Sequence, residues 1–182
     1  PGVDYVCSDN AAGAELAADQ LLRSGCRRFG WLNHSPSTWA GRMRGEAFSR
    51  ALQARGVDVE RNLAILACPE EGYTGGFQAA ALADEALEGI FCANAQIACG
   101  FLDGMRQRGK QAPEDYQLIG FDNTPPTAQY SYQLTTLHQD VAAISRQALA
   151  RLQERTVDPL QPSRTTWVEV TLIHRRTSPF II

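Results

Sequence analysis

The alternation of short apolar runs with helix-like patterns constrains the fold of this chain most. Five apolar runs precede residue 122, and they are Tyr5–Ser8, Phe29–Leu32, Ala64–Cys68, Gly89–Ala93 and Tyr116–Phe121. Between the first two, apolar residues recur at helical spacing from Ala14 to Leu22, and Gly25 follows as a helix terminator. Strands that alternate with helices imply right-handed crossovers and a parallel sheet. We therefore predict the α/β class, a Rossmann-like parallel sheet with helices on both faces.

The regular alternation of strand and helix patterns ends after Asp122. The segment Asn123–Pro126 contains two prolines and cannot continue a helix. Beyond it we expect a strand at Leu134–Leu137, a helix from Val141 to Leu152, and a last strand at Trp167–Ile173.

Charge and hydropathy exclude two classes of partner. The 182 residues carry a net charge of -3, whereas a nucleic-acid-binding module usually has a basic face. No apolar run approaches the roughly 18 residues that a membrane helix needs. We expect this chain to contact neither DNA nor a membrane directly.

Metal, disulfide and enzyme motifs are missing from the sequence. Its five cysteines, Cys7, Cys26, Cys68, Cys92 and Cys99, have no C-x-x-C spacing and are expected to be reduced, buried thiols. The three histidines stand far apart, which argues against a zinc site. No phosphate-binding loop, dinucleotide fingerprint or G-x-S-x-G elbow occurs. We predict no metal, no cofactor and no catalytic activity.

Polar side chains follow several of the expected strands. In an open parallel sheet, ligands bind beyond the carboxyl ends of the strands. Carboxylate, guanidinium and amide groups at one edge suit the hydroxyls of a polyol, and an aromatic ring suits the apolar face of a sugar. The candidate ligand-binding residues are Arg42, Asp122, Asn94, Thr38, Gln139, Trp39 and Tyr73. Singly, each has an ordinary alternative: Asn94 as a helix cap, Asp122 as a loop cap, and Arg42 as a surface charge.

Several segments resemble the lac-repressor family of bacterial transcription regulators. Ile90–Gly100 is similar to the family's "IFCANDQMALG", Pro113–Asn123 to "PEDVSVIGFDN" and Leu134–Gln139 to "LTTIRQ". Further matches, at Asp9–Arg28, Ala40–Gly45 and Leu172–Ser178, occur in the family's order and extend over nearly the whole chain.

The resemblance implies a periplasmic-binding-protein-like core of type I, with two lobes and an effector between them. Residues 1–121 and 164–182 would form the C-terminal lobe, and residues 122–163 the crossover and part of the N-terminal lobe. The DNA-binding helix-turn-helix would precede Pro1 and is absent from this chain. The family's effector contacts fall on Thr38, Arg42, Asn94, Asp122 and Gln139, and its homodimer contacts on Cys99 and Tyr130.

Three positions depart from the family pattern. Ala95 replaces an acid, Cys26 replaces a common histidine, and Glu71 occupies the position of an aromatic residue that often stacks on the effector. Either Tyr73 or Trp39 takes over that stacking, or the effector is more polar.

The expected function is the ligand-sensing and dimerisation portion of a cytoplasmic transcriptional regulator of the repressor type. It would bind a sugar or similar metabolite and control, allosterically, an operator contacted by the missing N-terminal domain. The alternative is an exported sugar-binding protein that serves a transporter. The reduced-looking cysteines and the Gly120–Asn123 motif favour the regulator. An enzyme on the same kind of sheet ranks third.

Overall fold

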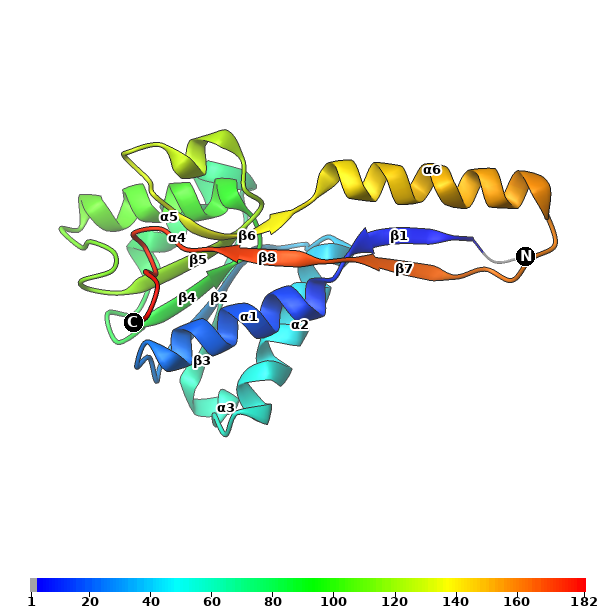
Figure 1. Cartoon of the computed structure of the whole chain (residues 1–182). Coiled ribbons are helices and arrows are strands. Elements are labelled where there is room, and N and C mark those ends of the chain that lie inside the picture. Colours follow the sequence, from blue (N-terminus) through cyan, green and yellow to red (C-terminus); the bar gives the residue numbers. More distant parts are fainter. Residues whose placement is uncertain (1–2) are drawn as a thin grey trace.

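The computed structural model describes residues 3–182 and shows a sheet-centred body with a slender arm (Figure 1). The elements in chain order are β1 (Tyr5–Ser8), α1 (Asn10–Arg23), β2 (Phe29–His34), α2 (Trp39–Ala54), α3 (Val59–Asn62), β3 (Leu63–Cys68), α4 (Gly72–Leu82), β4 (Gly89–Cys92), α5 (Ala95–Gln107), β5 (Gln117–Phe121), the 3-10 turn η1 (Pro125–Ala128), β6 (Thr135–Gln139), α6 (Val141–Val157), β7 (Thr165–Val168) and β8 (Val170–Ile173).

The body is built on a six-stranded sheet in the order β3-β2-β4-β5-β6-β8. Its strands pair in parallel except for β8, which runs antiparallel to β6. Successive side chains of a strand point to opposite faces. On β4, Phe91 packs with α1 and α2 on one face, whereas Ile90 and Cys92 pack with α4 and α5 on the other. The α/β class with helices on both faces is confirmed.

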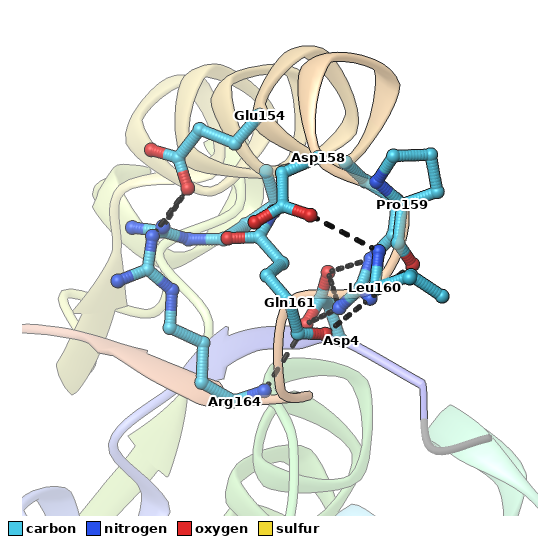
Figure 2. A network of polar contacts seen from close by, with 9 residues as sticks. Asp4, Glu154, Asp158, Pro159, Leu160, Gln161 and Arg164 are labelled. Atoms are coloured by element: carbon cyan, nitrogen blue, oxygen red, sulfur yellow. Dashed lines mark hydrogen bonds and ion pairs between the residues drawn. The ribbon is translucent and has the colours of Figure 1, made fainter.

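The arm consists of β1, β7 and α6, which projects alongside the two strands (Figure 1). The strands β1 and β7 form a separate parallel pair. At its tip, Asp4 accepts hydrogen bonds from the Arg155 guanidinium at 2.9 Å and from the Arg164 backbone N–H at 3.1 Å. Figure 2 shows Asp4 joined in this way to the segment that links α6 to β7. These contacts hold β1, α6 and β7 together.

The sheet boundaries differ from the division expected from the sequence. The strand at Thr135–Gln139, expected in the crossover, is an inner strand of the large sheet. By contrast, β1 was expected in the body but pairs only with β7. The expected last strand, Trp167–Ile173, is interrupted at Glu169 and contributes to both sheets. Strand partners are chosen across long sequence separations, which local patterns do not encode. The chain therefore passes between arm and body three times, after β1, after β6 and between β7 and β8.

Candidate functional site

A pocket of about 250 Å³ opens at the carboxyl edge of the large sheet. Three helices begin there, and the residues that precede α2, α4 and α5 all line it. Thr38 and Asn94 cap α2 and α5 by accepting hydrogen bonds from the backbone N–H groups of Gly41 and Ile97. The full lining is Asn33, His34, Thr38, Gly41, Arg44, Glu71, Gly72, Ala93, Asn94 and Gln96.

Arg44 is the buried cation of this pocket. Its Nε donates to Asn10 Oδ1 at 2.9 Å, and its Nη1 donates to the Ala93 carbonyl at 2.8 Å. The guanidinium carbon lies 3.5 Å from the centroid of the Phe121 ring. Burial lowers the pKa of Arg44 well below its ordinary value, to about 10, and the negative charge of Asp122 acts in the opposite direction. The guanidinium is therefore a hydrogen-bond donor whose position is fixed by its contacts, although burial disfavours its charged form.

Asp122 stands at the junction between body and arm. Its φ of 81° lies in the left-handed region, which few residues other than glycine adopt and which is often found at functional sites. Gln139 Nε2, at the end of β6, donates to Asp122 Oδ1, and Ser8 Oγ, at the end of β1, donates to Gln139 Oε1 at 2.5 Å. A continuous hydrogen-bonded path thus connects Asp122 with the first strand of the arm.

The structure brings four of the seven predicted residues together. Thr38 and Asn94 line the pocket. Asp122 and Gln139 are bonded to each other, and Asp122 lies near enough to Arg44 to act on its pKa. These placements agree with a site at the carboxyl edge of the large sheet.

The other three predicted residues lie elsewhere. Arg42 is exposed and does not line the pocket. Trp39 lines a second, larger hollow of about 520 Å³ with Tyr5, Cys7, Thr165 and Trp167, between the start of α2 and the arm. The Tyr73 hydroxyl donates to Asp103 on α5 at 2.6 Å, and this contact directs it away from the pocket.

The predicted dimer positions lie on the α5 side of the body. Cys99 is buried on α5, where burial raises the pKa of its thiol to about 11. Tyr130 is 88% exposed in the segment that follows η1. Their role in a dimer stays a prediction.

Three residues around the site were not among the candidates from the sequence: Ser8, Asn10 and Arg44. For Arg44, the helical spacing of the neighbouring residues indicates its burial. Gly41, Arg44, Phe48 and Ala51 follow helical spacing and share the buried face of α2, whereas Arg42 falls on the opposite face. Tracing this face would have selected the second arginine of the pair.

A family profile described as "periplasmic binding protein-like domain" matches residues 18–178. The chain belongs to this family. Its relatives include the transcriptional repressor PurR of Mannheimia succiniciproducens, 26% identical over 97% of this chain and 53% of that protein. Another is the transcriptional regulator GalS of Salmonella typhimurium, 27% identical over 94% of this chain and 51% of that protein. The chain thus spans about half the length of these relatives.

Solved structures of regulators have the same fold as this chain. A LacI family transcriptional regulator from Enterococcus faecium with bound ribose superposes with a TM-score of 0.86 at 27% identity, covering 97% of this chain and 65% of that one. The Enterococcus faecalis regulator with bound ribose gives 0.83 at 28% identity, covering 97% and 63%. The resemblance to the lac-repressor family and the periplasmic-binding-protein-like fold are confirmed.

Residues 3–182 contain neither a cluster of metal-ligating side chains nor a membrane-spanning helix. No group of three or more His, Cys, Asp or Glu side chains there is placed to hold a metal ion. Over the same residues, every helix is too short or too polar to cross a membrane.

Proposed function

We propose that this chain is the ligand-sensing part of a cytoplasmic, lac-repressor-type transcriptional regulator, and that a small sugar is its effector. The observation that carries the proposal is the position of Arg44. A buried guanidinium faces a polar pocket at the carboxyl edge of the sheet, close to the carboxylate of Asp122. Guanidinium, carboxylate and the amide of Asn94 together donate to and accept from the hydroxyls of a polyol. The ribose-bound regulators of the same fold support the choice of ligand class.

The arm provides the route by which binding would alter the rest of the protein. In the proposed regulator, β1, α6 and β7 belong to the N-terminal lobe, and the remaining elements form the C-terminal lobe. The Ser8–Gln139–Asp122 path lies where the chain crosses between the two. An effector that touches Asp122 favours one angle between arm and body over another, which shifts the population of conformations. A coupling of ~1–3 kcal/mol is typical of such switches.

The partners follow from the same proposal. The regulator acts as a homodimer through the α5 side, which includes Cys99 and Tyr130. It contacts its operator through an N-terminal domain outside this chain. It catalyses no reaction, and it uses no cofactor.

The proposal is tested by thermal denaturation of the full-length protein with ribose, other monosaccharides, disaccharides and nucleobases. We expect one sugar to raise the melting temperature in a concentration-dependent way, because a ligand that binds only the folded state stabilises it. Asp122→Ala and Arg44→Met should abolish that shift, while the matched control Arg50→Met, at an exposed position of the same helix, should retain it. A sugar-induced shift that survives both site substitutions would refute the site. A full-length protein that begins with an export signal in place of a DNA-binding domain would support the transporter alternative.

A further inference from the structure

The loop that joins β5 to β6, residues 122–134, has an unusual backbone conformation at both ends. Asp122 opens it with a φ of 81°, and Gln133, near its close, has a φ of 44°. Both values lie in the left-handed region, which residues other than glycine seldom adopt. Such a conformation persists only where the surrounding contacts fix it. The contacts that hold this loop therefore also determine the position of Asp122.

Arg175, which follows β8 in the chain, provides these contacts. Its Nη2 donates to Asn123 Oδ1 at 2.7 Å, and its Nη1 donates to Thr127 Oγ1 at 3.1 Å and to the Leu134 carbonyl at 2.9 Å. One planar guanidinium thus binds the start, the middle and the end of the loop. All its acceptors in the loop are uncharged oxygens, and burial lowers the pKa of Arg175. The geometry of the guanidinium, rather than an opposite charge in the loop, therefore holds the loop closed.

Asn123 connects Arg175 to the site residue Asp122. The two loop residues are consecutive, so the bond from Arg175 to the Asn123 side chain restricts the turn at Asp122. On the side of β6, the Asp122 backbone N–H donates to the Leu137 carbonyl at 2.9 Å, and the Asp122 carbonyl accepts from Thr136 Oγ1 at 2.9 Å. Loss of the Arg175 side chain would therefore release the loop side of Asp122 and leave the β6 side in place.

The same loop leads to an exposed surface. Thr127 is fully buried, and its carbonyl accepts from the Leu134 backbone N–H at 2.8 Å, which closes the loop across its base. Beyond this closure, Tyr130 is exposed to solvent. The loop is thus one hydrogen-bonded unit that extends from Asp122 to the surface around Tyr130.

We propose that Arg175 is a positioning residue of the effector site, which fixes Asp122 through Asn123 and joins it rigidly to the surface around Tyr130. The inference rests on the proposed function, because Asp122 is the site residue that Arg175 positions. Arg175 does not line the pocket, so it acts on binding only through the loop. Effector binding at Asp122 then alters the mobility of the loop as far as Tyr130.

The first test is hydrogen exchange of the full-length protein without sugar. Arg175→Met should speed exchange of the Thr127 and Leu134 amides at least about tenfold, because the hydrogen bonds from its guanidinium to the loop are lost. Exchange in β4, which these bonds do not touch, should change less than about twofold. Asn123→Ala should speed exchange of the same loop amides, and the double variant should exchange no faster than Arg175→Met, because both substitutions remove the same contact.

Arg176→Met is the matched control. Arg176 is the next residue in the chain, is exposed, and reaches only the Tyr130 and Ser131 carbonyls, at 3.5 and 3.4 Å. Long, exposed hydrogen bonds of this kind contribute little. Its substitution should therefore change exchange of the loop amides less than about twofold.

The second test is isothermal titration with ribose and the other sugars of the thermal panel. Arg175→Met and Asn123→Ala should lower the affinity for the bound sugar at least about tenfold and threefold, respectively, whereas Arg176→Met should retain it. A role in stability alone would lower the urea midpoint and leave the affinity of the folded protein unchanged. The bound sugar should also slow exchange between Thr127 and Leu134 in the wild-type protein but not in Arg175→Met.

The outcomes separate this inference from the proposed function. Unchanged exchange of the loop amides in Arg175→Met would refute the closing role of this side chain. If exchange speeds up but sugar affinity is unchanged, the sensor function stands and the positioning role is refuted. If no sugar binds the wild-type protein, the proposed function fails, and the positioning role fails with it. Asn123→Ala provides the same measurements if Arg175→Met does not fold.

Discussion

Replacing Arg44 with methionine should remove effector binding without lowering the stability of the protein. Lowering the pKa of Arg44 from its ordinary value to about 10 corresponds to a penalty of about 3 kcal/mol on its charged form in the folded protein. Methionine removes that penalty and keeps a long chain over Phe121. It also forfeits the hydrogen bonds to Asn10 and Ala93, which are worth about 1.5–3 kcal/mol each when the donor is charged. At the lower end of that range the two bonds together are worth about 3 kcal/mol, which cancels the penalty, so we expect a change of less than about 1 kcal/mol.

The lowered pKa of Arg44 makes the free energy of unfolding depend on pH. A base whose pKa is lower in the folded state binds fewer protons there than in the unfolded chain. The penalty is therefore fully present at neutral pH and is relieved as pH rises above about 10, towards the ordinary pKa of arginine. Arg44→Met should remove this contribution to the pH dependence.

Urea denaturation of both proteins at neutral pH measures the change, with Arg155→Met as the matched control. Arg155 pairs with Asp4 at 2.9 Å, so its loss should destabilise the protein by about 2 kcal/mol. If Arg44→Met costs as much as the control or more, Arg44 is a stabilising residue. The argument that it is retained for ligand binding would then be wrong.

Three further predictions follow from packing, the arm and the cysteines. Gly100→Ala should lower the free energy of unfolding in urea by at least about 3 kcal/mol, because the new Cβ would lie 2.0 Å from the Tyr73 carbonyl oxygen. Gly56→Ala, the control, has open space around it and a φ of +87°, so it should cost only about 1 kcal/mol. Equal losses would contradict the close packing of α4 on α5. Asp4→Ala should speed hydrogen exchange in β1 and β7 by at least tenfold, because the lost hydrogen bonds are worth about 2 kcal/mol. Asp58→Ala, at an exposed position, is the control and should have no effect there. Unchanged exchange in Asp4→Ala would show that the arm does not depend on this contact. Cys26 and Cys99, whose pKa values burial raises to about 11, should react with iodoacetamide at pH 8 only after unfolding, and rapid labelling of the native protein would refute their burial.

The sequence predicted the sheet-and-helix order well because each strand or helix leaves a local pattern. The run Gly89–Ala93 is apolar throughout and proved to be the central, doubly covered strand β4. Asn94 and Thr38 were placed correctly at strand ends, where they cap the following helices. These features depend on neighbours within a few residues.

The differences between expectation and structure mostly concern relations between distant segments. Nothing local shows that β1 belongs to the arm and β6 to the large sheet, because both are short runs that mix apolar and polar residues. Arg42 was predicted from a motif, whereas Arg44, on the buried face of the same helix, is the arginine that lines the pocket. The direction of Tyr73 was set by Asp103, thirty residues away, and could not be read from its own surroundings.

The most direct test of the account is a crystal structure of the full-length protein with the sugar that raises its melting temperature. We predict that the sugar lies between arm and body, with one hydroxyl within hydrogen-bonding distance of Asp122 and an oxygen within reach of Arg44. Sugar bound elsewhere, with Arg44 and Asp122 making only the contacts described above, would contradict it.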